Sequence, residues 1–424
     1  MNRAVLTICE AVRAAGGRAM LVGGWVRDYL LGIESKDFDI EVYGVEPQRL
    51  RALLETIAPV NAVGWQFAVY KLAFRGPPSF EIDVSIPRRE SKSGRGHRGF
   101  TIEGDPQMSF EEAARRRDFT VNAILFDPLT DEVVDPFGGA SDLKARLLRA
   151  VDDDTFVEDS LRVLRAVQLA ARFEMSVEPR TARLCGAVDL ADLPHERVWG
   201  EVEKLLTMAA RPSIGIQVAL ELGVLDKLFP EIRALADGDL FAHTKLAMDE
   251  AARLTVDLTK EKRVAVMLAV LCHGLGVEAA RGVMSRLGLY TLSGYDVRSQ
   301  ALALVREHLR PAEFYDDREQ LADGAFRRLA RTVDLDLLYR VAKAVAVGRG
   351  AASAIKEDWF IEKARELGVE YRAPEPVLKG RHLIEAGFAP GPRMGEILRA
   401  VYELQLDGRV ADLDQALAAA RRLA

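Results

Sequence analysis

The sequence has few cysteines and lacks a long apolar run. Its three cysteines among 424 residues, Cys9, Cys185 and Cys272, are too scattered for a disulfide framework or a zinc site, which favours a reducing compartment. No window approaches the roughly 18 consecutive apolar residues of a membrane span. Residues 1–17 place Glu10 and arginines among apolar positions, as in an amphipathic helix and not a signal peptide. We therefore expect a cytoplasmic protein without membrane association.

The sequence also lacks internal repeats of the length that builds solenoids, and it has no low-complexity tract. Its net charge of −6 argues weakly against a nucleic-acid partner, because phosphate binding needs local positive charge. Residues 88–98, however, carry five Arg or Lys against one Glu, and 115–117 are all Arg. Such runs are usually solvated surface. Two of them around a candidate phosphate site make phosphate binding an equally good interpretation.

The two parts of the chain differ in pattern. Short strand-like runs bounded by turn residues occur before about residue 150, at 18–24, 38–44, 68–74, 80–86 and 120–128. A helical pattern at 47–58 lies among them. Beyond residue 151 strand patterns almost vanish, and Leu, Ala, Arg and Glu recur at helical spacing. The sequence therefore predicts an α/β head followed by a long helical remainder.

The segment 21–44, LVGGWVRDYLLGIESKDFDIEVYG, predicts a strand, a glycine turn, a helix and a second strand. Gly23 and Gly24 allow a phosphate to approach the backbone at the start of the helix, and Arg27 adds positive charge there. Asp37 and Asp39 share one face of the second strand. Two adjacent carboxylates with substrate phosphates suit Mg²⁺. A bare pair of this kind is more often a strand-end surface feature, so the prediction depends on the whole unit.

Two further segments add candidate residues. Glu81 and Asp83 share a strand face, so one or both are candidates to join the first carboxylates around two metal ions. Arg117 and Asp118 precede Asn122, which combines phosphate-binding and hydroxyl-binding groups. An exposed edge strand and a surface salt bridge are the alternative interpretations.

The helical pattern at 157–173 places Asp159 three residues before Arg162, where the two side chains can lie side by side. An ordinary helix ion pair is one interpretation. The other is base selection: an acceptor beside a donor matches the N4 and N3 atoms of cytosine and the N6 and N1 atoms of adenine, and mismatches uracil and guanine.

Together these segments resemble the class II tRNA nucleotidyltransferase (CCA-adding enzyme) and bacterial poly(A) polymerase family over nearly the whole chain. The resemblance implies an α/β head of the nucleotidyltransferase (polymerase beta-like) type with a mixed sheet, followed by an all-helical neck, body and tail. It divides the chain into a catalytic head at 1–150, a base-recognising neck at 151–210, a body at 211–310 and a tRNA-binding tail at 311–424.

The resemblance also assigns residues. It implies metal-binding roles for Asp37 and Asp39, with Asp83 as the third catalytic carboxylate. It implies that Asp135 and Gly138 shape a hinge between head and neck. The nucleotide-binding residues would be Gly23, Gly24, Arg27, Arg117, Asp118, Asn122, Glu158, Asp159, Arg162 and Arg165.

The implied activity is template-independent addition of CMP and AMP from CTP and ATP to the tRNA 3′ end, with Mg²⁺ and without an obligate protein partner. A flexible loop at 91–113 would argue modestly against a CC-only enzyme. An A-adding enzyme, a CC-adding enzyme, a poly(A) polymerase and a non-catalytic RNA-binding protein remain alternatives. Lys379, Arg381 and Arg393 in the tail are weak candidates for RNA contact.

One departure concerns the HD phosphohydrolase domain that some relatives carry. His243 and His273 are present, but Gly274 stands where the family has the metal-binding Asp. We therefore expect the two histidines to pack in the body and expect no hydrolase activity.

Overall fold

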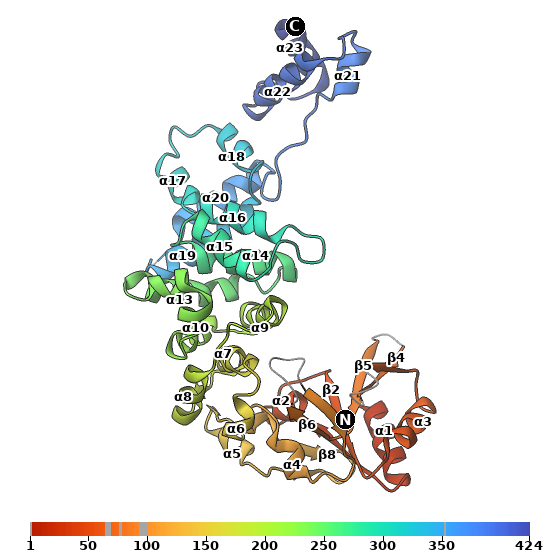
Figure 1. The fold of residues 1–424 in the computed structure, drawn as a ribbon. Coiled ribbons are helices and arrows are strands. Elements are labelled where there is room, and N and C mark those ends of the chain that lie inside the picture. The colour runs from red at the N-terminus through yellow and green to blue at the C-terminus, as the bar shows by residue number, and fades with distance from the viewer. Residues whose placement is uncertain (1, 64–68, 76–78, 93–99, 352) are drawn as a thin grey trace. The chain divides into compact units, whose positions relative to one another are not determined.

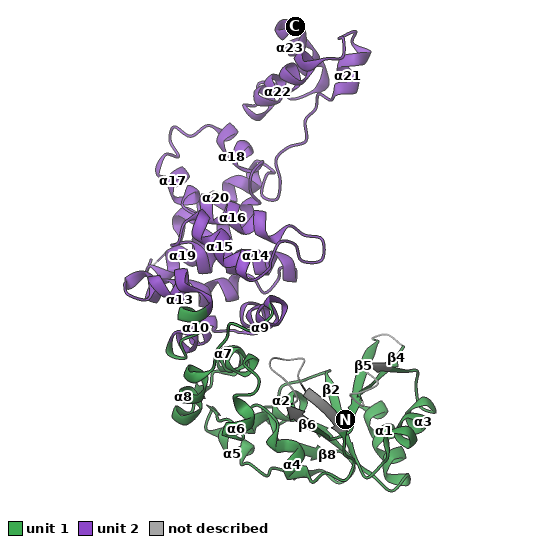
Figure 2. Cartoon of the chain, in the orientation of Figure 1, with its two compact units in different colours: residues 1–194, 221–227 green, residues 195–220, 228–424 purple. Residues whose placement is uncertain are grey.

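The computed structural model describes residues 2–63, 69–75, 79–92, 100–351 and 353–424. The chain divides into two compact units (Figure 2). Unit 1 comprises residues 1–194 and 221–227, and unit 2 comprises 195–220 and 228–424. No helix in the described residues is both long and apolar enough to cross a bilayer.

Unit 1 is built on a seven-stranded mixed sheet (Figure 1). Its order is β3-β4-β5-β2-β1-β8-β9, in which β2 and β5 are parallel and the other neighbours are antiparallel. The strands are β1 (Arg18–Val22), β2 (Phe38–Tyr43), β3 (Val60–Val63), β4 (Val69–Phe74), β5 (Phe80–Ser85), β8 (Leu125–Asp127) and β9 (Glu132–Val134). Two small ladders pair β6 (Arg88–Lys92) with β7 (Phe100–Gly104), and β10 (Leu147–Leu148) with β11 (Ser176–Val177).

Helices complete unit 1. They are α1 (Arg3–Ala14), α2 (Gly24–Leu30), α3 (Pro47–Glu55), α4 (Phe110–Arg115), the 3₁₀ turn η1 (Thr120–Asn122), α5 (Gly139–Lys144), α6 (Asp153–Phe156), α7 (Leu161–Phe173), α8 (Pro179–Ala187) and most of α11 (Val224–Leu228). The start of α4 shows why helices begin where they do: Ser109 and Glu112 form a reciprocal capping box. Alternating side chains of β1 and β8, including Met20, Val22 and Leu125, are buried in the core against α4.

Unit 2 is helical apart from one isolated bridge in the part of the chain that the structure describes. Its helices are α9 (His195–Met208), α10 (Pro212–Glu221), α12 (Pro230–Leu235), α13 (Asp239–Leu254), α14 (Lys260–Cys272), α15 (Val277–Arg286), α16 (Val297–Glu307), α17 (Arg310–Asp316), α18 (Asp323–Leu329), α19 (Leu335–Gly348), α20 (Ile355–Glu366), α21 (Gly380–Glu385), α22 (Pro392–Leu406) and α23 (Leu413–Leu423). Helix α14 is the central one, because every residue from Val264 to Cys272 is buried. The last three helices have a small core of their own, with Leu383, Val401 and Ala420 at its centre.

The predicted fold class, a mixed-sheet α/β head and a helical remainder, is confirmed. The structure adds strands that the sequence did not suggest, β3, β6, β7, β9 and β10, and β11 extends pairing beyond residue 151. The run 120–128 is only partly a strand, since Thr120–Asn122 form a 3₁₀ turn. The expected loop at 91–113 contains β7 and the start of α4, while its residues 93–99 lie outside the described residues. The four-part domain division stays a prediction.

Candidate active site

The turn at Gly23, between β1 and α2, leaves its backbone open to close approach by a ligand. Gly23 has φ +70°, a left-handed conformation that favours glycine. A Cβ there would lie 3.3 Å from an Nη atom of Arg117 and 3.7 Å from a carboxylate oxygen of Asp39. The glycine therefore leaves space for a ligand beside a positive and a negative side chain.

Asp39 and Asp83 are direct partners in the parallel pairing of β2 with β5. Desolvation by the surrounding protein atoms raises the pKa of Asp39 to about 6. The Arg117 guanidinium opposes this rise, whereas the Asp83 and Asp37 carboxylates add to it. Asp83 accepts two hydrogen bonds from Lys71 Nζ, both 3.0 Å. Asp37 is exposed just before β2 begins.

This donor set fits a hard cation that also binds substrate phosphates. The Asp83 and Asp37 carboxylates act on Asp39 as smaller causes of its raised pKa, and a bound cation would neutralise this shared negative charge. Among the residues that the structure describes, no three His, Cys, Asp or Glu side chains lie close enough to hold a metal by themselves. Mg²⁺ commonly takes one or two protein carboxylates and completes its shell with phosphate oxygens and water.

Asp118 accepts hydrogen bonds from two other residues that line the site. Its Oδ1 accepts from the side-chain amide of Asn122 at 3.0 Å, and its Oδ2 accepts from Arg165 Nε at 2.6 Å. Burial alone would raise the pKa of Asp118, but the Arg165 guanidinium and the Asn122 amide hold this pKa below its usual range. A carboxylate, an amide and a guanidinium are thus held together as groups that can bind hydroxyls.

Arg27 has a different environment from the one expected of an exposed phosphate ligand. Its guanidinium is buried, hydrogen-bonds Asp28 Oδ1 at 2.6 Å and donates to Asn122 Oδ1 at 2.8 Å. It also stacks over the ring of Phe173, 4.2 Å from the ring centroid. Arg27 therefore lines the site while orienting Asn122.

Helix α7 begins at Leu161, so the predicted helical stripe starts later than the sequence suggested. Asp159 precedes the helix, and its Oδ1 accepts from the backbone N–H of Leu161 at 3.1 Å. Arg162 Nη1 donates to the carbonyl of Thr155 at 2.8 Å, and its Nη2 donates to the carbonyl of Arg116. These backbone contacts fix the direction of the Arg162 guanidinium.

The predicted residues converge on one pocket of about 300 Å³ within unit 1. Every residue that lines this pocket was singled out from the sequence: Gly23, Gly24, Arg27, Asp39, Arg117, Asp118, Asn122, Asp159, Arg162 and Arg165. Four candidate residues do not line it: Asp37, Glu81, Asp83 and the exposed Glu158. The geometry brings the groups together, whereas their roles stay predictions.

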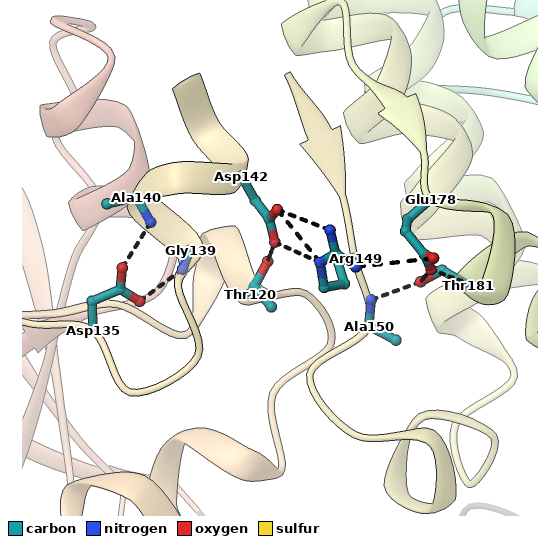
Figure 3. Close-up of polar contacts among 9 residues, drawn as sticks. All are labelled: Thr120, Asp135, Gly139, Ala140, Asp142, Arg149, Ala150, Glu178 and Thr181. Carbon is teal, nitrogen blue, oxygen red and sulfur yellow. Dashed lines mark hydrogen bonds and ion pairs between the residues drawn. The ribbon is translucent and has the colours of Figure 1, made fainter. Parts of the chain in front are cut away.

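A polar network lies behind the η1 turn (Figure 3). Asp142 on α5 accepts from the Thr120 hydroxyl at 2.7 Å and from Arg149 Nε at 3.1 Å. Arg149 also faces Glu178 at 3.9 Å. The network therefore connects the turn that carries Asn122 to the segment before α8.

The segment that the sequence suggested as a hinge forms the start of α5. Both oxygens of Asp135 accept backbone N–H groups there, from Gly139 at 2.7 Å and from Ala140 at 2.9 Å (Figure 3). Gly138 has φ +72°. The contacts show a capped helix start, and the hinge role stays a prediction.

Three histidines cluster in unit 2. The rings of His243 and His273 are 4.8 Å apart between centroids, and those of His273 and His308 are 5.6 Å apart. A Cβ on Gly274 would lie 2.6 Å from Leu240 Cδ2. Leu240 therefore occupies the space that an Asp at 274 would need, and the absence of hydrolase activity stays a prediction.

Comparison with known proteins decides the family. The family described as "Poly A polymerase head domain" matches residues 19–149, and "Probable RNA and SrmB- binding site of polymerase A" matches 175–235. The "Multifunctional CCA protein" of Xanthomonas campestris pv. campestris (strain B100) is 33% identical over 417 residues, which cover 89% of this chain and 95% of the relative. The chain belongs to the class II CCA-adding enzyme and poly(A) polymerase family. It is a nucleotidyltransferase, as predicted.

Other comparisons agree with this family. The "Multifunctional CCA protein" of Mannheimia succiniciproducens is 39% identical over 273 residues, covering 60% of this chain and 62% of that protein. The crystal structure of the Bacillus stearothermophilus CCA-adding enzyme in complex with CTP has a TM-score of 0.73 at 23% identity, covering 100% of this chain and 98% of that one. The Thermotoga maritima CCA-adding enzyme complexed with tRNA has a TM-score of 0.66 at 22% identity, covering 100% and 96%. These two structures show a shared fold, and nucleotidyltransferases of this kind generally use divalent metal ions.

Sequence reasoning missed Glu41, a buried acid on β2. The signal was present, since Glu41 follows Asp39 by two residues and so shares its strand face. It also missed Asp28, the buried partner of Arg27. An Asp directly after a phosphate-site arginine gives no sequence signal that separates pairing from surface charge.

Proposed function

We propose that this enzyme adds CMP and AMP to the 3′ end of tRNA, completing CCA without a nucleic-acid template. The observation that carries the proposal is the pocket of about 300 Å³ in unit 1, which is lined by the glycine turn, Asp39 of β2, residues 117–122 and the start of α7. The relatives named multifunctional CCA proteins, and structures of CCA-adding enzymes with CTP and with tRNA, support these substrates.

The nucleotide would bind with its triphosphate at the Gly23 turn. Arg117 lies beside this turn and provides positive charge for the phosphates. Asp118 and Asn122 are buried and hydrogen-bonded to each other, and they would exchange this contact for one to a ribose hydroxyl. Positioning and charge stabilisation would supply most of the rate enhancement.

Base choice would depend on Asp159 and Arg162. A carboxylate acceptor beside a guanidinium donor matches the Watson–Crick edges of cytosine and adenine, whereas uracil and guanine present the opposite order. The backbone carbonyls of Thr155 and Arg116 hold the Arg162 guanidinium in one direction. The protein itself would thus take the place of a template.

The tRNA 3′ hydroxyl would attack the α-phosphate, forming a phosphodiester bond and releasing pyrophosphate. Asp37 and Asp39 would hold Mg²⁺, with Asp83 beside Asp39 as a third carboxylate. Two such ions would activate the attacking hydroxyl and neutralise charge on the leaving pyrophosphate. When no nucleotide is bound, the Lys71 ammonium group pairs with Asp83 and so weakens the repulsion between the Asp83 and Asp39 carboxylates.

The deciding experiment incubates the protein and Mg²⁺ with labelled tRNAs that end before CCA, after the first C, and after CC, each with CTP, ATP or both. Extension of all three to CCA is expected. Growth of only the CC-ended tRNA by one A would identify an A-adding enzyme, and arrest after CC a CC-adding enzyme. Long A tails would identify a poly(A) polymerase, and no extension would leave an RNA-binding protein.

A matched pair of variants tests the site itself. Asp39→Asn should lower incorporation by at least about 100-fold, because the neutral amide is a poor ligand for a hard cation. Asp127→Asn is the control, since Asp127 is another acid of the sheet but is buried and pairs with Arg18 at 2.8 Å, outside the pocket. Equal incorporation by Asp39→Asn and the wild-type protein would exclude this mechanism.

A further inference from the structure

Glu41 is a buried acid behind the candidate active site. Its residue is 1% exposed, and its place on β2 puts it on the same strand face as Asp39. An ionised carboxylate at such a position is costly unless it is paired and hydrogen-bonded. The contacts of Glu41 therefore indicate what holds it there.

Three side chains surround this carboxylate. Arg116 Nη2 donates to Oε1 at 3.1 Å, and Arg117 Nη2 lies 3.6 Å from Oε2. The Tyr43 hydroxyl donates to Oε2 at 2.7 Å. Burial, and after it the nearby Glu41 charge, raises the pKa of Tyr43, so this hydroxyl stays protonated as a donor.

The two arginines extend from Glu41 toward different parts of the pocket. Arg117 reaches the Gly23 turn with its Nη1, and its charge opposes the raised pKa of Asp39. Arg116 presents its backbone carbonyl to the Arg162 guanidinium. One buried carboxylate thus holds the segment that contacts both the glycine turn and the base-facing arginine.

We infer that Glu41 is a positioning residue that fixes the Arg117 guanidinium over the Gly23 turn, where it binds the phosphates of the incoming nucleotide. This inference rests on the proposed function. Free arginine side chains sample many rotamers, and ordering one on binding weakens affinity. A guanidinium already held by Glu41 avoids this cost.

The test measures binding of two fragments of the substrate to the full-length protein by calorimetry. Inorganic pyrophosphate with Mg²⁺ probes the phosphate wall, and cytidine probes the base and ribose wall. Glu41→Gln keeps the shape but removes the charge that holds Arg117. We expect its dissociation constant for pyrophosphate to rise about tenfold or more and its KM for CTP to rise in parallel, with cytidine binding changed less than about twofold.

Two further variants make the result specific. Asp127→Asn also removes a buried charge partner of an arginine in the same sheet, and it should leave pyrophosphate binding unchanged. Glu41→Asp keeps the charge on a shorter side chain; it should fold if Glu41→Gln does not, and should show an intermediate loss of pyrophosphate affinity.

The outcomes separate the inference from the proposed function. Wild-type pyrophosphate affinity in a folded Glu41→Gln or Glu41→Asp protein would overturn the role of Glu41. An equal loss of cytidine and pyrophosphate binding would also overturn it, because it would indicate general disruption of the fold. A wild-type protein that extends no tRNA would instead overturn the proposed function.

Discussion

Gly139 lies closer to its neighbours than any side chain allows. A Cβ at this position would be 2.1 Å from the carbonyl oxygen of Thr120 and 2.8 Å from Ile124 Cγ1. Gly139, the first residue of α5, therefore packs directly against the η1 backbone at Thr120, two residues before Asn122. This close approach sets the position of a pocket residue through the backbone alone.

Gly139→Ala should consequently lower the free energy of unfolding of unit 1 by about 1–3 kcal/mol, because the backbone of η1 must move to accept the methyl group. Gly186→Ala in α8 is the matched control, since nothing lies within 4 Å of its added Cβ. There alanine should be neutral or stabilising by up to about 1 kcal/mol. Urea unfolding compares the two variants, and equal stability would contradict this account.

Strand alternation predicted that carboxylates on two strands lie near each other, but it left both Glu81 and Asp83 as candidates, and the family resemblance selected Asp83. The structure places Asp39 and Asp83 opposite each other in the pairing of β2 with β5. The hydrogen bonds from Arg27 to Asp28 and Asn122 were not predictable from the sequence. It depends on which buried groups the fold leaves in need of partners, and a single sequence does not contain that information.

At the scale of elements, a buried hydroxyl on α8 contacts the segment that follows β10. The Thr181 hydroxyl accepts from the backbone N–H of Ala150 at 2.9 Å and donates to Glu178 at 3.1 Å (Figure 3). Thr181 is 1% exposed, so water cannot replace these contacts. This contact adds to the backbone hydrogen bond from Glu178 N–H to the Leu148 carbonyl, so the start of α8 and the end of the β10 segment are joined by several polar contacts.

Thr181→Val keeps the shape of the side chain but removes the hydroxyl. The Ala150 N–H would then be buried without its acceptor, which costs about 1–3 kcal/mol. Hydrogen exchange should show faster exchange of the peptide containing Ala150, while Thr181→Ser should retain protection. Unchanged protection in Thr181→Val would show that the hydroxyl does not join the two elements.

Elements were predicted well where their period is long and regular. The helices α1, α3 and α7 and the strands β1, β2, β4 and β5 all lie within segments that the sequence identified. The edge strands β3 and β9 were missed because they are short, with four and three residues, and so show too few alternations to form a pattern. The 3₁₀ turn at Asn122 reads as a strand in sequence, since β-branched residues flank it.

At the scale of the whole molecule, the histidine cluster predicts a pH-dependent stability of unit 2. Burial lowers the pKa of His273 to about 4, with the charges of His243, His308 and Arg349 as smaller causes. Burial also lowers the pKa values of His243 and His308. The facing charges of the other histidines and of Arg349 disfavour a proton on these rings, whereas the carbonyls of Val270, Val305 and Val345, together with Glu313, favour one. Burial is the largest cause for all three rings, so their pKa values fall and the neutral form is favoured in the folded protein.

The unfolded chain binds these protons near pH 6.5, whereas the folded chain resists them, so stability rises with pH between about 4 and 6.5. For His273, which is 4% exposed, the full shift corresponds to about 3 kcal/mol lost once the pH falls below about 4. Urea unfolding of unit 2 at a series of pH values measures this change in the free energy of unfolding. His273→Gln should flatten the dependence, and the exposed His195→Gln should not; equal slopes in both would contradict the assignment.

The contact of Leu240 with Gly274 has a consequence for redesign. A Cβ at 274 would lie 2.6 Å from Leu240 Cδ2, so any side chain there requires Leu240 to change rotamer or to be replaced by a smaller residue. A metal site engineered beside His273 with a carboxylate at 274 would therefore be built as a double change, at 240 and at 274 together.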